Sequence, residues 1–311
     1  MKRIIIIICL VGTLAFTFVK RTSKDRDFVS GLSKPLPSQS ESMLQNPLVK
    51  YVTLSEDINL EYAETGETNG IPVIFLHGYS DSWKSFQPVL PYLPSSIHAF
   101  YLSQRGHGNS SKPLSGYHPK DFAKDVSDFM KVWNIKAAII VGHSMGGTVA
   151  QRFALDFPEK TKGLILIGSF PSFRNNAPVK ELRDYVDNMN ASVDTGFVKE
   201  FQKSTIVKAI PANYFDTVIS ESLKVPAHVW KGVSTDLLNT DFARELKCIN
   251  KPTLIIWGNK DSFCQLHDKN SLLNAIPGSS LKAYEGIGHA VHWEEPERFA
   301  SDLMTFIKAI K

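Results

Sequence analysis

The length, composition and charge of the chain set the first limits. Its 311 residues are enough for one large α/β domain with short additions and do not require two domains. The hydrophobic fraction of 43% and the charged fraction of 21% exclude a disordered or collagen-like chain. The formal net charge is +4, and residues 1–50 alone hold eight Lys/Arg against three Asp/Glu. Because the basic excess is confined to this leading segment, the sequence argues against nucleic-acid binding, which needs a basic folded face.

The chain begins like an exported or membrane-targeted protein. Met1, Lys2 and Arg3 precede an uninterrupted apolar run at residues 4–19, and a basic cluster lies within residues 20–26. The run would span about 24 Å as a helix, less than the roughly 30 Å of a hydrocarbon core. Small residues within the run offer a weak cleavage site, whereas the basic cluster favours retention. We therefore expect residues 1–20 to act as a signal peptide or a membrane anchor, which predicts a periplasmic or cell-envelope protein if the source is bacterial.

A polar stretch separates this segment from the rest of the chain. Residues 21–47 are rich in Ser, Pro and Lys and lack any apolar periodicity. This composition is typical of a flexible tether.

From residue 48 onward, short apolar strands alternate with helical stretches. Continuous apolar strands of four to seven residues are typical of a parallel sheet that is covered on both faces. We therefore expect a doubly wound, mostly parallel α/β architecture. The predicted strands are 49–54, 58–64, 71–76, 99–102, 137–141, 163–167 and 252–257, and the clearest helical patterns are 121–133, 148–157 and 295–307.

The spacing of the predicted strands changes after residue 167. About 84 residues separate strand 163–167 from strand 252–257, compared with roughly 30 in an ordinary strand–helix–strand unit. Helical patterns at 179–189 and 197–206 occupy part of this interval. We expect a helical cap at about residues 171–240, inserted between the sixth and seventh core strands of a domain that covers residues 48–311.

A candidate nucleophile, Ser144, lies in the pentapeptide Gly-His-Ser-Met-Gly at residues 142–146. The pentapeptide directly follows the apolar strand 138–141, and a helical pattern begins immediately after it. In this context the glycines tolerate a crowded turn that lifts the serine above the sheet, and the helix N-terminus favours negative charge beside it. The pattern predicts a nucleophilic serine.

A serine hydroxyl needs a base to take its proton and an acid to orient that base. Asp261 comes just after strand 252–257, at the carboxyl end where sites gather in α/β sheets. His289 lies in a glycine-bracketed loop at residues 286–290. His292 is the nearest competitor, but it enters the next helical stretch and is expected to cover the start of that helix. We predict that Ser144, His289 and Asp261 form a catalytic triad.

The negative oxygen that develops during acyl transfer needs hydrogen-bond donors. One candidate is the backbone N–H of Met145, immediately after the nucleophile. The other is the backbone N–H of Tyr79, in the loop that follows His77-Gly78. We also expect the side chains of Tyr79 and Trp83 to border the substrate pocket.

Taken in chain order, these motifs resemble those of the α/β-hydrolase superfamily. The resemblance covers residues 50–311, and the stretch 284–299 is similar to bacterial esterases and cofactor-free haloperoxidase-type hydrolases. It implies a Ser, Asp, His chain order, a cap and catalysis without a metal or an organic cofactor. The motifs are His77-Gly78-Tyr79, Arg105-Gly106-His107-Gly108-Asn109-Ser110, Gly142-His143-Ser144-Met145-Gly146-Gly147, Asp261 and Gly288-His289.

The predicted substrate is a small, largely apolar ester or lactone. The cap region holds several aromatic residues and no Arg or Lys cluster that would clamp a phosphate. Haloalkane dehalogenases and epoxide hydrolases are set aside because they place an aspartate where this chain has Ser144. A carbon–carbon bond hydrolase of diketones, a ligand sensor that keeps the hydrolase fold, and a docking protein stay open as alternatives, as does the oligomeric state.

Overall fold

A computed structural model describes residues 47–174, 176–189 and 193–310 of the chain. The apolar run 4–19 and most of the predicted tether lie outside the described residues, so the expectations of export, anchoring and flexibility stay predictions. In the part of the chain that is described, no helix is both long and apolar enough to span a bilayer.

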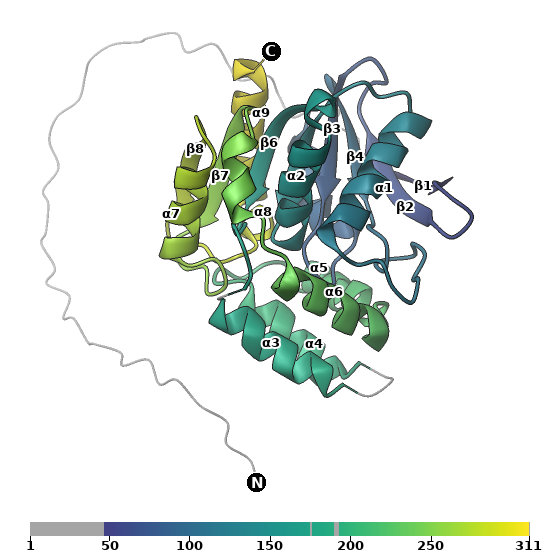
Figure 1. The fold of residues 1–311 in the computed structure, drawn as a ribbon, viewed down its shortest axis with the longest axis vertical. Coiled ribbons are helices and arrows are strands. Elements are labelled where there is room, and N and C mark those ends of the chain that lie inside the picture. The colour runs from purple at the N-terminus through teal and green to yellow at the C-terminus, as the bar shows by residue number, and fades with distance from the viewer. Residues whose placement is uncertain (1–46, 175, 190–192, 311) are drawn as a thin grey trace, which may run out of the picture. The chain divides into compact units, whose positions relative to one another are not determined.

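Eight strands form a single, mostly parallel sheet in the order β1-β2-β4-β3-β5-β6-β7-β8 (Figure 1). β1 pairs antiparallel with β2 and β2 pairs antiparallel with β4, whereas all other neighbours are parallel. β4, β5 and β7 are buried at every residue, as expected for strands covered on both faces. The strands are β1 Leu48–Thr53, β2 Asn59–Thr65, β3 Ile71–Leu76, β4 Ile97–Leu102, β5 Ala138–His143, β6 Thr161–Ile167, β7 Thr253–Gly258 and β8 Ser280–Tyr284.

Helices cover both faces of the sheet, so the predicted doubly wound architecture is confirmed. Apolar side chains of α1, α2 and α7 pack in one hydrophobic cluster, and those of η1 and α9 pack in a second cluster on the opposite face (Figure 1). Each cluster buries alternate side chains of the same strands, which is why the strand runs are continuously apolar. The covering helices are η1 Trp83–Tyr92, α1 Pro119–Val132, α2 Met145–Asp156, α7 Leu266–Ala275, α8 Val291–Glu294 and α9 Pro296–Ala309, with short 3-10 turns η2 Pro158–Lys160 and η3 Ala243–Cys248.

Among the described residues between β6 and β7, four α-helices form the predicted cap at one end of the sheet (Figure 1). Two of them begin at side chains that accept a hydrogen bond from the first helical turn: Asn176 accepts from the N–H of Val179, and Asp194 accepts from the N–H of Phe197. The four helices are α3 Ala177–Asp187, α4 Thr195–Ser204, α5 Ala212–Leu223 and α6 Ala227–Asn239.

Strand β8 was not predicted from the sequence. Its residues are mostly exposed or half-buried, and only Tyr284 is buried. Because β8 is the last strand of the sheet, it pairs only with β7 and needs no continuous apolar run. The pattern that identified the central strands is therefore absent here.

Candidate active site

Ser144 occupies the strained turn that the pentapeptide predicted. It lies between β5 and α2 with φ 52° and ψ −114°, and its backbone N–H donates to the carbonyl oxygen of Ile167 at 2.9 Å. A Cβ at Gly142 would come within 2.2 Å of the carbonyl oxygen of Gly146, and a Cβ at Gly146 would come equally close to that of Leu76. Only glycine fits at these two positions, so the turn presents Ser144 at the carboxyl end of β5.

Asp261 and His289 come together although 28 residues separate them. The Nδ1 atom of His289 lies 2.8 Å from Oδ2 of Asp261, whose side chain is fully buried. The other oxygen of Asp261 accepts the backbone N–H groups of Phe263 and Cys264, each at 2.8 Å. The carboxylate is thus held from two sides, and its contact to Nδ1 leaves Nε2 of His289 as the ring atom available to a hydroxyl.

His292, the competing histidine, contacts η1 and not Asp261. It is fully buried, and its Nε2 atom lies 3.1 Å from the hydroxyl of Ser85 in η1. Burial lowers the pKa of His292 to about 3. It therefore packs near the start of α8, as predicted, and Asp261 contacts His289.

The loop that carries His289 is tied to the cap, a link that no sequence pattern indicated. The backbone N–H groups of His289 and Ala290 both donate to the carbonyl oxygen of Thr205, at 2.9 and 3.0 Å. The carboxylate of Glu294 accepts the N–H of Gly288 at 2.8 Å and that of Val207 at 3.1 Å. Burial raises the pKa of Glu294. Cap residues just after α4 therefore help to hold the His289 loop in place.

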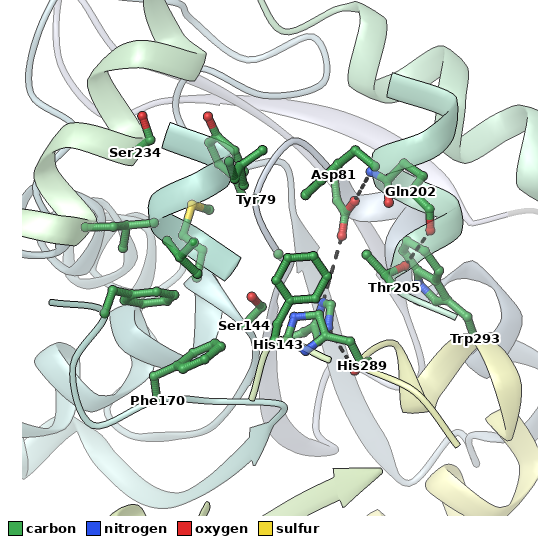
Figure 2. Close-up of a pocket in the computed structure, with 18 residues that line it drawn as sticks. Tyr79, Asp81, His143, Ser144, Phe170, Gln202, Thr205, Ser234, His289 and Trp293 are labelled. Atoms are coloured by element: carbon green, nitrogen blue, oxygen red, sulfur yellow. Dashed lines mark hydrogen bonds and ion pairs between the residues drawn. The ribbon is translucent and has the colours of Figure 1, made fainter. Parts of the chain in front are cut away.

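A pocket opens beside Ser144 and His289 (Figure 2). Its wall is predominantly apolar on the side of β6 and the cap, and polar groups gather near Asp81 and Gln202. The lining residues that contribute the apolar wall include Phe170, Phe173, Val179, Leu182, Leu237 and Phe263. Ser144 is partly exposed, so its hydroxyl is accessible from this pocket.

The two predicted oxyanion donors border the same pocket. Tyr79 follows the end of β3, and Met145 is the first residue of α2. Among the described residues, neither backbone N–H donates to a protein acceptor. The phenol of Tyr79 donates to the carbonyl oxygen of Trp230 in α6 at 2.6 Å, which fixes the loop against the cap. Two free donors beside a serine can bind a developing negative oxygen.

The prediction that Trp83 borders the pocket was wrong. Trp83 is 5% exposed and packs with Phe75 and Phe86 in the hydrophobic cluster beneath α9. It is the first residue of η1, and this helix turns its apolar side toward the sheet. The pocket is lined by Trp293 of α8 and Phe201 of α4, and not by Trp83.

Within the described ranges, no group of three or more His, Cys, Asp or Glu side chains is arranged to hold a metal ion.

Comparison with known proteins agrees with this fold. Residues 71–211 match the profile of the family described as alpha/beta hydrolase fold. A non-heme chloroperoxidase from Streptomyces lividans is 26% identical over 294 residues, covering 83% of this chain and 99% of the relative. Epoxide hydrolase 1 from Caenorhabditis elegans is 25% identical over 286 residues, covering 83% of this chain and 70% of the relative. The structure of an esterase from Exiguobacterium antarcticum superposes with a TM-score of 0.77 at 23% identity, covering 84% of this chain and 100% of the esterase.

The sheet order, the cap and the turn at Ser144 define the α/β-hydrolase fold. The sequence matches the profile of that family over residues 71–211.

Proposed function

We propose that the protein is a serine hydrolase that cleaves a carboxylic ester or lactone through an acyl-enzyme intermediate. The observation that carries the proposal is the 2.8 Å contact of Asp261 with His289, which lines the same pocket as Ser144. An oriented histidine beside a serine on a strained turn is the arrangement that activates a hydroxyl for acyl transfer.

In this mechanism the Ser144 oxygen attacks the ester carbonyl carbon, and its proton passes to Nε2 of His289. Asp261 stabilises the resulting imidazolium through Nδ1. The N–H groups of Tyr79 and Met145 stabilise the oxyanion. As the carbon–oxygen bond breaks, His289 protonates the leaving alkoxide and regenerates its neutral ring. Water then attacks the acyl-enzyme and gives a proton to His289. His289 returns this proton to the Ser144 oxygen as the carboxylic acid leaves, which restores the free enzyme.

The apolar wall of the pocket supports a small, largely apolar substrate. No Arg or Lys side chain lines the pocket within the described residues, so a substrate with several negative charges would find no partner there. A nucleophilic serine also separates the proposed reaction from that of epoxide hydrolases, which the sequence comparison includes among the relatives. Carbon–carbon hydrolysis of a diketone uses the same triad and is the second candidate reaction.

A panel of p-nitrophenyl esters, lactones and vinylogous diketones tests the proposal against the wild type and Ser144→Ala. We expect Ser144-dependent turnover of the esters or lactones. Turnover of the diketones alone would establish carbon–carbon hydrolysis instead. Saturable binding without turnover of any member would identify a sensor.

We also propose that residues 4–19 direct the protein out of the cytoplasm or hold it at the membrane, because an apolar run with basic flanks is typical of such segments. Fractionation of cells that make the full-length chain should place the protein in the membrane or exported fraction. Recovery of the whole population in the soluble cytosol contradicts this proposal.

A further inference from the structure

Asp81 is a buried carboxylate on the polar side of the pocket, and the proposed reaction does not use it. It lies two residues after Tyr79, is 4% exposed and lines the same pocket as Ser144 (Figure 2). The amide of Gln202 in α4 donates to Oδ1 at 3.1 Å, and the hydroxyl of Ser85 in η1 donates to Oδ2 at 3.1 Å. Both donors are neutral, so they compensate only part of the cost of a buried charge.

No cation neutralises Asp81 among the described residues. Lys84, the nearest basic residue in sequence, pairs with Glu221 at 2.7 Å. The phenol of Tyr214 on α5 donates to the backbone of Ser85 rather than to Asp81. Burial raises the pKa of Asp81 to about 7, although Gln202, Ser85 and His289 oppose the increase. A buried carboxylate without a counter-charge destabilises the fold, which is typical of a group kept for binding.

His143 presents a second acceptor opposite Asp81. Its Nε2 atom lies 3.3 Å from the carbonyl oxygen of His289, and because a carbonyl only accepts, Nε2 carries the ring proton. Burial lowers the pKa of His143 well below its usual value, so the ring is neutral. Its Nδ1 atom is therefore an acceptor, and this buried atom has no hydrogen-bond partner. Nδ1 lies 3.9 Å from Oδ2 of Asp81, too far for a direct hydrogen bond.

Two acceptors that face each other call for a group with at least two hydrogen-bond donors between them. An alcohol has one donor, whereas a primary ammonium has three and also supplies the missing positive charge. Gly78 lies beside this gap: a Cβ there would come within 2.7 Å of Nδ1 of His143 and 3.2 Å of Oδ2 of Asp81. Because Gly78 has no side chain, nothing from this residue fills the space beside the two acceptors.

We infer that Asp81 and His143 form a subsite for a primary ammonium group, and that the substrate is an otherwise apolar ester or lactone that carries one primary amine. The effect of this subsite on turnover rests on the proposed ester hydrolysis. Binding of an ammonium group to the subsite can be tested without any turnover. On this inference Asp81 determines substrate specificity, because it binds the amine of the substrate at a distance from the bond that breaks.

Matched pairs of esters test the inference in the wild type. Each pair has a terminal ammonium in one member and a methyl group in the other, with a range of chain lengths and with the amine on either the acyl or the alcohol side. At about pH 8, where Asp81 and the amine are both charged, we expect kcat/KM to favour the amino ester by about tenfold or more on one of the two sides. Preference for the methyl member in every pair overturns the inference.

Asp81→Asn removes the charge and keeps the shape of the side chain. We expect this variant to lose the preference, so that the ratio of kcat/KM for the amino ester to kcat/KM for the methyl ester falls by about tenfold or more. Asp216→Asn, on the exposed side of α5, is the matched control and should keep the preference. A preference that survives in Asp81→Asn assigns the ammonium to another group and contradicts the inference.

Binding of n-alkylammonium ions separates this inference from the proposed reaction, since it requires no turnover. The ions should raise the melting temperature of the wild type and leave that of Asp81→Asn unchanged, and the corresponding alkanols should not distinguish the two proteins. Equal effects on both proteins overturn the subsite. A different outcome is that the ions stabilise the wild type alone while no ester of either series is cleaved in a Ser144-dependent way. The subsite would then be supported and the proposed ester hydrolysis would be wrong.

The same variant should fold, because it removes a buried charge. The folded protein binds the Asp81 proton more tightly than the unfolded chain, whose pKa is near 3.8. The contribution of this group to stability is therefore complete below about pH 4 and decreases as the pH rises to about 7. We expect the melting temperature of Asp81→Asn relative to the wild type to increase over this window. A melting-temperature difference between the two proteins that stays constant over this pH range would show that Asp81 does not titrate within it.

Discussion

Ser144→Ala is expected to eliminate labelling by a fluorophosphonate probe and to reduce ester turnover by about 10⁶-fold. The turn at Ser144, with φ 52° and a partly exposed side chain, presents its hydroxyl to the pocket beside His289. An alanine fits the same turn because it adds no atom to the backbone environment, so the loss should come from chemistry and not from unfolding. Mass spectrometry of the labelled peptide and steady-state rates measure the two effects.

Ser220→Ala is a suitable control for this experiment. Ser220 lies on α5, and its hydroxyl donates to the backbone carbonyl of Asp216 in the same helix. This variant should keep both labelling and turnover. Labelling that persists in Ser144→Ala would show that another serine is the activated one, and the proposed mechanism would fail.

Asp261→Asn is expected to lower kcat by about 10⁴-fold with little change in KM. The backbone N–H groups of Phe263 and Cys264 hold one oxygen of Asp261, so the carbonyl oxygen of an asparagine will take that position. Its NH₂ group then faces Nδ1 of His289 at the 2.8 Å contact. A donor there makes Nδ1 the acceptor and moves the ring proton to Nε2. A protonated Nε2 cannot take the proton of Ser144.

Stopped assays at high enzyme concentration and a thermal melt separate this effect from a folding defect. Asp128→Asn, which changes a surface ion pair with Lys124 on α1, is the matched control and should keep its rate. A well-folded Asp261→Asn with near-normal kcat would mean that a different carboxylate orients His289.

The central sheet and the nucleophile turn were predictable because their signals are local. Buried parallel strands need continuous apolar runs, so β3 to β7 stand out in the sequence. The turn at Ser144 needs glycine at positions 142 and 146, because the backbone of neighbouring segments leaves no room for a Cβ. The cap was also visible, since the strand spacing changes where it is inserted.

The incorrect prediction for Trp83 concerned the direction of a side chain, which the sequence does not specify. Trp83 comes four residues after Tyr79, close enough in sequence to suggest the pocket, but η1 rotates it into the core. Local composition does not encode that rotation, because an aromatic side chain fits a core and a pocket wall equally well. Edge strand β8 was missed for the opposite reason, since its exposed positions carry no apolar pattern.

The sequence alone determined the fold class, the candidate residues Ser144, Asp261 and His289, and the position of the cap, since each depends on residue types and spacings along the chain. Only the tertiary structure decided what surrounds them. The contact of His289 with Asp261 and the opposition of Asp81 and His143 join residues from separate strands and loops, at 2.8 and 3.9 Å. Such distances follow from how the layers pack, and a difference of one ångström there separates a hydrogen bond from an open subsite.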